Sequence, residues 1–144
     1  MIDISSKPSA VRIATASGCI HLKPETVDRI RRGDVEKGDP LEMAKIAGIL
    51  AVKSTSQTIL LCHPLPITHV KIDVKITGTH TVKVTSTVKA EAKTGVEMEA
   101  LVATATALLN IWDMVKPYEK NEAGQYPTTR ITDLIVERKV VEKP

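Results

Sequence analysis

The chain has 144 residues, 42% of them hydrophobic and 26% charged, a balance that fits one globular domain with a sizeable core over residues 1–144. Aromatic residues make up only 2%, with no phenylalanine, which counts against aromatic platforms for stacking bases. The formal net charge of +3 is too small for a strongly basic nucleic-acid-binding arm, although it is compatible with a phosphate-bearing ligand.

The first part of the chain predicts a strand followed by two helices. An irregular apolar strand is expected over about residues 11–22. Pro24 suits a first helical turn and Gly33 follows the last basic residues, so a short helix is predicted over residues 24–32.

The second helix has a clear start signal. Asp39 can cap it, Pro40 needs no amide donor in the first turn, and Glu42 can complete a capping box. The helix is therefore expected from residue 40 to about 54, mostly buried, with a polar stripe opposite an apolar side. The stripe comprises Glu42, Lys45 and Lys53, and the apolar side comprises Met43, Ile46, Ala47 and Leu50.

The middle of the chain predicts extended structure. The apolar run 58–62 is interpreted as an inner strand, and Pro64 and Pro66 then prevent regular pairing in a segment that suits a functional loop. Apolar and polar residues alternate over residues 70–77 and again over residues 82–88, on either side of a glycine turn. This pattern predicts a hairpin with one solvated face.

A long helix and a last strand complete the chain. Thr94 can cap the helix with Glu97 three residues later, and Pro117 is expected to end it at about Val115. A last strand is predicted over residues 130–137. The resulting order of strands and helices favours an α+β fold, a ferredoxin-like antiparallel sheet with helices packed on one face.

Neither the cysteines nor the apolar runs indicate export or membrane insertion. Two cysteines are too few for a disulfide framework, and the N-terminal residues lack the pattern of a signal peptide. The longest uncharged run, residues 100–112, is shorter than the roughly 20 residues needed to span a bilayer. We therefore expect a cytoplasmic protein without a membrane partner.

The last turn of the long helix contains a candidate acid and base pair. Asp113 and Lys116 are three residues apart, so they share one helix face, and burial of the preceding turns would shift their pKa values toward neutrality. Such a pair can exchange protons. The alternative is ordinary helix-end electrostatics, since carboxylates at the start of a helix and a lysine at its end suit the macrodipole.

Other polar residues give weaker signals. His63 follows an apolar run and could emerge at a sheet edge, although a lone histidine is more often structural. Lys37 precedes a helix start, where it could bind a phosphate, but it lacks the glycine pattern of a P-loop. We expect no metal site, because the candidate zinc ligands have poor spacing. These candidates are Cys19, His21, Cys62, His63 and His69.

Several segments, in order, resemble the molybdenum cofactor biosynthesis protein C family, the cyclic pyranopterin monophosphate synthases. Two of the segments are long and unusual, so their joint occurrence by chance is very improbable. The segments are Asp3-Ile4-Ser5 with Lys7, Arg12, Lys37-Gly38-Asp39, Lys45-Ile46-Ala47-Gly48-Ile49, Leu61-Cys62-His63-Pro64-Leu65, Thr94-Gly95-Val96-Glu97-Met98-Glu99-Ala100-Leu101 and Asp113-Met114-Val115-Lys116.

The resemblance implies a fold, an assembly and a reaction. It implies a ferredoxin-like subunit in a homohexamer, a trimer of dimers, with sites at subunit interfaces. Its substrate would be the cyclic dihydro-GTP made by an upstream radical SAM enzyme. The reaction would yield cyclic pyranopterin monophosphate and pyrophosphate, with no required cofactor and with any assistance by Mg²⁺ left open. Ring opening, ring closure and cyclic phosphate formation all need proton transfer and cationic groups.

The resemblance also implies residue roles. Asp113 would be the catalytic acid, with Lys116 and Lys37 as essential lysines. The tail departs from the family, because Lys139 is not followed by a glycine-rich stretch, and Trp112 and Val115 stand where tyrosine and cysteine are usual. The implied substrate-binding residues are Arg12, Lys53, Leu61, Cys62, His63, Glu97, Met98, Glu99 and Lys139.

Two other classes of function stay open from the residues alone. A small RNA-binding module would share the topology and the basic pI, but the predicted strands contain no Phe, Tyr or Trp. A non-catalytic regulatory domain that binds a small ligand between subunits would leave Asp113 and Lys116 without a task. Turnover of the cyclic dihydro-GTP separates these alternatives from an enzyme.

Overall fold

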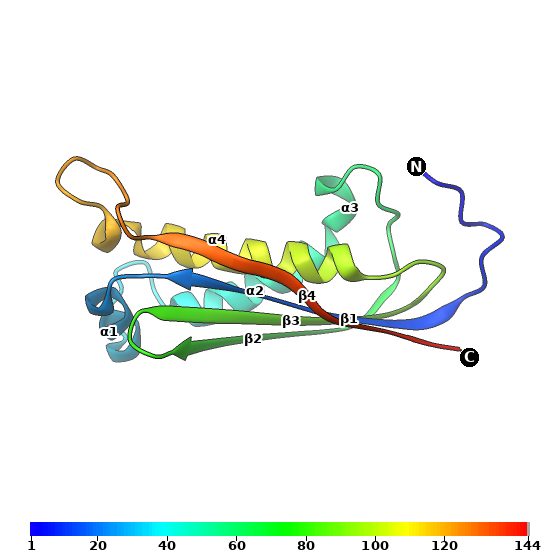
Figure 1. Ribbon diagram of the computed structural model, residues 1–144, viewed down its shortest axis with the longest axis horizontal. Coiled ribbons are helices and arrows are strands. Elements are labelled where there is room, and N and C mark those ends of the chain that lie inside the picture. The colour runs from blue at the N-terminus through cyan, green and yellow to red at the C-terminus, as the bar shows by residue number, and fades with distance from the viewer. Residues whose placement is uncertain (144) are drawn as a thin grey trace.

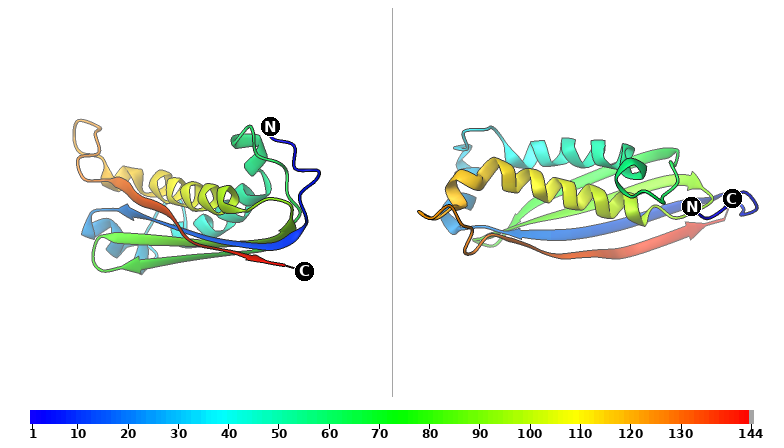
Figure 2. Two further views of the ribbon diagram at one scale, coloured as in Figure 1. Left: turned by 45° about the vertical axis from the view of Figure 1, so that its right-hand side comes forward. Right: turned by 90° about the horizontal axis from the view of Figure 1, so that it is seen from above.

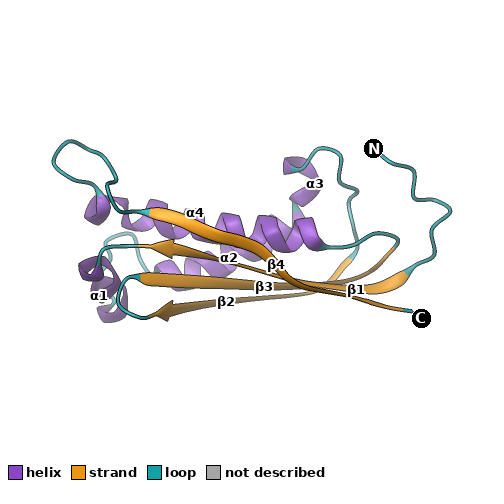
Figure 3. Ribbon diagram, in the orientation of Figure 1, coloured by secondary structure: helices purple, strands orange, loops and turns teal. Residues whose placement is uncertain are grey.

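The computed structural model describes residues 1–143, and their helices and strands follow the predicted order except around residues 55–62, where a short helix and turns replace the predicted strand. The strands form one antiparallel sheet in the order β2-β3-β1-β4, and the two longest helices, α2 and α4, cover one of its faces (Figures 1 and 3). This is the ferredoxin-like α+β arrangement that the sequence predicts. The elements are β1 (Ala10–His21), α1 (Pro24–Arg32), α2 (Pro40–Lys53), α3 (Thr55–Thr58), β2 (Ile67–Thr77), β3 (Thr81–Ala92), α4 (Glu97–Glu119) and β4 (Arg130–Glu142).

The boundaries of α1 and α2 follow the predicted signals. Gly33 ends α1 in the left-handed region, with a φ of 68°. The Asp39 carboxylate accepts hydrogen bonds from the backbone N–H groups of Leu41 and Glu42, which caps α2. The capping box is not completed in the expected way, because the Glu42 carboxylate pairs with Lys45 at 2.9 Å.

The core lies between the helices and the inner face of the sheet. β3 contributes Val82, Val84 and Val88, which are fully buried against the small residues of α4. α2 and α4 approach closely where α2 carries Gly48, since a Cβ there would lie 3.4 Å from the carbonyl oxygen of Ala103. This close approach positions both helices on the sheet.

The predicted apolar side of α2 is wrong for the single chain. Ile46 and Leu50 are 54% and 60% exposed, and Met43 is exposed as well, whereas α2 buries its smaller residues. The reason is the close packing of α2 on α4, which only small side chains allow. The residues that α2 buries are Pro40, Ala44, Gly48, Ala51 and Val52.

The predicted strand over residues 58–62 is also wrong. The chain forms the short helix α3 instead, in which the Thr55 hydroxyl donates to the carbonyl of Ala51, and it continues through turns. Leu60 and Leu61 are 79% and 73% exposed. Apolar character alone does not distinguish a buried strand from an apolar surface loop.

The long helix differs from its prediction at both ends. α4 begins at Glu97 after Val96, without a side-chain cap from Thr94, and it continues through Pro117 to Glu119. β4 is likewise longer than predicted and reaches Glu142. α4 is the one helix in residues 1–143 with the length and composition to cross a membrane, but half of its most apolar stretch is buried, as suits a core helix.

Candidate active site

The C-terminal end of α4 brings together the three residues predicted to be catalytic. The Asp113 carboxylate lies 3.0 Å from the ammonium nitrogen of Lys116, one turn further along the same helix face. It also lies 3.0 Å from the ammonium nitrogen of Lys37, which comes from the loop between α1 and α2. The sequence placed Asp113 and Lys116 on one face, but only the fold brings Lys37 to them.

The electrostatics of this cluster differ from the expectation. The Asp113 side chain is 57% exposed, and those of Lys37 and Lys116 are 43% and 40% exposed. Hydrogen bonds from Lys37 and then Lys116 lower the pKa of Asp113, and the hydrogen bond to Asp113 raises the pKa of Lys116. The expected shift toward neutrality by burial is therefore wrong for the single chain, because attraction between opposite charges outweighs desolvation.

A pocket of about 400 Å³ lies at the other end of α4. Figure 2 shows the N-terminus of the chain on the same side of the molecule as the start of α4. It is lined by the start of α4, by the loop before β2 and by the N-terminal segment. Six predicted substrate-binding residues are among its lining residues. They are Leu61, Cys62, His63, Glu97, Met98 and Glu99.

The N-terminal segment also lines the pocket, although the sequence indicated no binding role for it. Met1, Ile2, Ile4 and Lys7 line the pocket opposite the start of α4. The ammonium group of Lys93 donates to the carbonyl of Ser5 at 2.8 Å and holds the segment in place. The feature of the sequence that could have indicated this role is the segment at residues 3–7, which resembles the family although it is exposed.

Glu97, which lines the pocket, has charged neighbours from two strands. Lys139 of β4 lies 2.7 Å from the Glu97 carboxylate, and Arg12 of β1 donates to the carbonyls of Ala92 and Lys93. Burial raises the pKa of Glu97, but the hydrogen bond from Lys139 and a backbone hydrogen bond lower it further, so the net shift is downward. The predicted residues Arg12, Glu97 and Lys139 therefore belong to one charged group.

Glu99 has the opposite surroundings. The residue lines the pocket but is only 4% exposed. Burial raises the pKa of Glu99, and the neighbouring charge of Glu97 raises it as well. One glutamate of the helix start is thus held in its charged form, and the second is shifted toward its protonated form.

Lys53, another predicted binding residue, does not line this pocket. It lines a shallower hollow formed with Ile49 of α2 and with β2. Leu65 lies between this hollow and the larger pocket and contributes to both. Within residues 1–143, no group of three or more His, Cys, Asp or Glu side chains is arranged to hold a metal ion.

The pocket and the charged cluster are far apart in one chain. Glu99 and Asp113 lie on the same helix, and a rise of about 1.5 Å per residue separates them by about 21 Å along its axis. Figure 1 shows α4 running along the sheet, so that its two ends lie far apart. A single small molecule cannot contact both groups of one chain.

The fold and these groups define a ferredoxin-like α+β enzyme subunit that suits an anionic small molecule. Comparison with known proteins identifies the family. The sequence matches the MoaC family over residues 1–141, and the chain belongs to that family. It is 54% identical over 140 residues to the probable cyclic pyranopterin monophosphate synthase of Pyrococcus horikoshii, covering 97% of this chain and 87% of the relative. The protein of the same name from Saccharolobus solfataricus is 52% identical over 143 residues, 99% of this chain and 95% of the relative. That from Methanococcoides burtonii is 53% identical over 142 residues, 99% of this chain and 89% of the relative.

Proposed function

We propose that this protein is a lyase of molybdenum cofactor biosynthesis. It converts 3′,8-cyclo-7,8-dihydroguanosine 5′-triphosphate, supplied by an upstream radical SAM enzyme, to cyclic pyranopterin monophosphate and releases pyrophosphate. The observation that carries this proposal is the convergence of Lys37, Asp113 and Lys116 in a chain of this family. A carboxylate between two ammonium groups offers both a proton acceptor and donors beside a polyanionic substrate.

The catalytic site is composite. The pocket of one chain binds the substrate, and the Lys37, Asp113 and Lys116 cluster of a second chain completes the site. This arrangement accounts for the separation of about 21 Å along α4. We propose a homohexamer, a trimer of dimers, whose contacts would also cover the exposed apolar residues of α2, Met43, Ile46, Ile49 and Leu50.

Desolvation in this assembly sets the chemistry of the cluster. In the single chain the charges of Asp113 and Lys116 stabilise each other. Covering the cluster with a second subunit and a triphosphate removes water and strengthens its interactions with developing charge. Lys37 then stabilises negative charge, while Asp113 and Lys116 transfer protons during ring opening and closure.

The pocket residues hold the substrate. His63 and the backbone around Leu61 and Cys62 offer hydrogen bonds at one wall, and Met98 offers an apolar surface for a fused ring. Arg12 and Lys139 bring positive charge to the mouth beside Glu97. The proposed reaction requires no cofactor, with any assistance by Mg²⁺ to be tested by turnover with and without the ion, and the proposed location of the enzyme is the cytoplasm.

Direct turnover tests the proposal. Purified protein is incubated with the cyclic dihydro-GTP, and the pterin product is followed by fluorescence after oxidation while pyrophosphate is measured with a coupled assay. We expect both products in equal amounts. Binding of the nucleotide without turnover, or binding of RNA at physiological salt instead, would contradict the proposed activity.

A further inference from the structure

Pro117 changes the hydrogen bonding of the last turns of α4. In an uninterrupted helix, the N–H of residue 117 would donate to the carbonyl of Asp113, four residues earlier. Proline has no N–H, so this donor is missing inside α4. The Asp113 carbonyl oxygen accepts a hydrogen bond from the Lys37 ammonium group at 3.2 Å instead.

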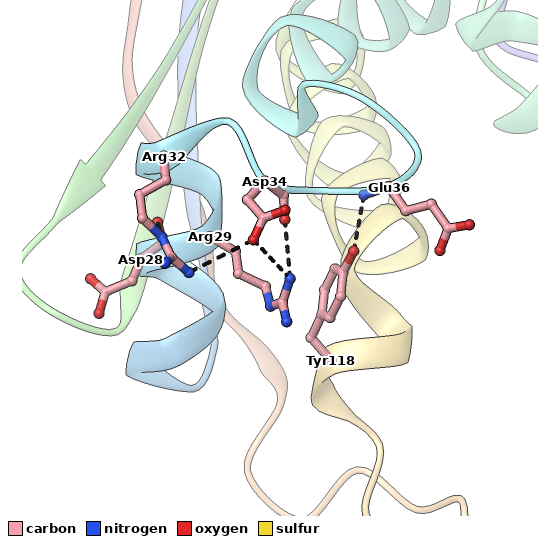
Figure 4. Close-up of polar contacts among 6 residues, drawn as sticks. All are labelled: Asp28, Arg29, Arg32, Asp34, Glu36 and Tyr118. Carbon is pink, nitrogen blue, oxygen red and sulfur yellow. Dashed lines mark hydrogen bonds and ion pairs between the residues drawn. The ribbon is translucent and has the colours of Figure 1, made fainter.

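Tyr118, the next residue, binds the loop that carries Lys37. Its hydroxyl oxygen accepts a hydrogen bond from the backbone N–H of Glu36 at 2.9 Å, as Figure 4 shows. Glu36 directly precedes Lys37, so this bond fixes the backbone from which the Lys37 side chain extends. The ring of Tyr118 points from α4 toward the loop over residues 33–39.

Arg29 connects the same ring to the start of the loop. Its guanidinium carbon lies 4.4 Å from the centroid of the Tyr118 ring, a cation–π contact. The guanidinium group also pairs with the Asp34 carboxylate at 3.1 Å (Figure 4). The loop is therefore attached to α4 at two points before Lys37.

These contacts restrict the otherwise flexible side chain of Lys37. A lysine has a flexible four-carbon stem, and an exposed ion pair alone restricts it weakly. Lys37 instead meets two acceptors of one residue, the carboxylate and the carbonyl oxygen of Asp113, from a backbone held by Tyr118. Its ammonium group is thus placed before substrate arrives.

We propose that Pro117 and Tyr118 are positioning residues for the reaction. Pro117 leaves the Asp113 carbonyl available to the Lys37 ammonium group, and Tyr118 fixes the backbone beside Lys37. This inference rests on the proposed function, specifically on a role for Lys37 in turnover.

The variant Pro117→Ala gives the sharpest test, because positioning and stability move in opposite directions. Alanine restores the N–H and suits a helix interior far better than proline, so the melting temperature should rise. The restored N–H then competes with the Lys37 ammonium group for the Asp113 carbonyl and weakens its hold on Lys37, so kcat should fall about tenfold or more while KM stays within about twofold. A rise in melting temperature with parental kcat would overturn the role of Pro117.

Tyr118→Phe tests the second contact, because it removes only the hydroxyl and keeps the ring beneath Arg29. We expect kcat to fall about tenfold. We also expect the ¹³C signal of the Asp113 carboxylate, followed by NMR, to titrate at a higher pH than in the parent, since Lys37 lowers the pKa of this group. The matched control is Thr87→Val, which removes one hydroxyl from the Thr15–Thr87 pair on the other face of the sheet. The control should change neither kcat nor the titration.

Lys37→Ala separates failure of this inference from failure of the proposed function. If Lys37→Ala reduces turnover to a small residual rate while Pro117→Ala and Tyr118→Phe keep parental kcat and parental titration of Asp113, the positioning roles are wrong and the function stands. If Lys37→Ala keeps parental turnover, the catalytic role of Lys37 is wrong and this inference fails with it. In the Lys37→Ala background, neither further substitution should reduce the remaining rate, and an additional tenfold loss would overturn positioning through Lys37.

Discussion

Asp113 accepts hydrogen bonds from two lysines that come from different parts of the chain. If the three groups work as a unit, removal of any one removes nearly the whole rate. Asp113→Asn and Lys116→Ala should each abolish measurable turnover, and the double variant should be no slower than the single ones. Because both side chains are exposed, the melting temperatures should stay within about 3 °C of the parent.

Initial rates and thermal unfolding of the three variants check this prediction. Helix-end electrostatics alone would give the reverse pattern, a slightly lowered melting temperature with turnover within a few-fold of the parent. Near-parental turnover in either single variant contradicts the assignment.

Glu97 and Glu99 are two residues apart and should respond to pH with opposite signs. The pKa of Glu97 is lowered in the folded chain, so its charge contributes stability above the ordinary carboxyl pKa, and this contribution is lost as pH falls through the lowered value. The pKa of Glu99 is raised, so its carboxyl group costs stability as pH rises through the raised value.

The isosteric variants isolate these two contributions. At pH 7, Glu97→Gln should destabilise the protein by no more than about 1 kcal/mol, because Lys139 is largely exposed, whereas Glu99→Gln should stabilise it. In acid, below both folded pKa values, the differences from the parent should largely disappear. Urea unfolding at a series of pH values measures both, and equal signs at pH 7 would contradict the assignment.

At the scale of elements, Glu119 joins three parts of the fold. Its fully buried carboxylate at the end of α4 accepts hydrogen bonds from the Lys23 backbone N–H and from the Thr26 hydroxyl at the start of α1. It also accepts from the Thr129 hydroxyl, just before β4, at 2.7 Å. The carboxylate therefore satisfies donors of α1 and fixes the entry to β4.

Glu119→Gln should lower the free energy of unfolding by about 2–3 kcal/mol. The substitution places an NH₂ group, which only donates, where a carboxylate oxygen accepts hydrogen bonds from the surrounding N–H and hydroxyl groups. The exposed Glu122, in the loop after α4, provides the matched control, and Glu122→Gln should leave stability unchanged. Guanidinium unfolding of both variants makes the comparison. A loss for Glu119→Gln no larger than for Glu122→Gln would refute the joining role.

The elements that the sequence predicts well are those with local signals. Pro24 and Gly33 mark α1, Asp39 caps α2, and strict alternation marks the hairpin of β2 and β3. The predicted end of the long helix was too early, because α4 tolerates Pro117. The N–H that Pro117 lacks leaves the Asp113 carbonyl oxygen free to accept a hydrogen bond from Lys37. No local signal connects Glu119 or Tyr118 to α1 or its loop, since those contacts depend on tertiary packing.

The site shows the same division. Segments such as Leu61-Cys62-His63 and Met98-Glu99 could be recognised from the sequence because each is a continuous stretch of residues that lines the pocket. The set of predicted site residues does not reveal the distance between that pocket and Asp113, which follows from the length of α4. The exposed face of α2 was likewise misassigned, because a sequence pattern does not show which apolar residues the packing on α4 buries and which it leaves exposed.

At the scale of the whole molecule, the composite site predicts complementation between two impaired variants. Lys116→Ala should disable the charged cluster, and His63→Ala should weaken the pocket. If each site takes its pocket from one chain and its cluster from another, a mixed dimer has one site with both defects and one site with none. Random mixing of equal amounts should then restore about a quarter of the sites.

The two variants are unfolded, mixed and refolded together, and turnover is compared with that of each variant refolded alone. Light scattering at micromolar concentration supplies the mass of the parent, expected to be that of a hexamer. The separation of about 21 Å along α4 makes the outcome decisive. If one chain held a complete site, mixing would restore nothing and a monomer would be fully active, whereas a composite site requires both the larger mass and the regained turnover.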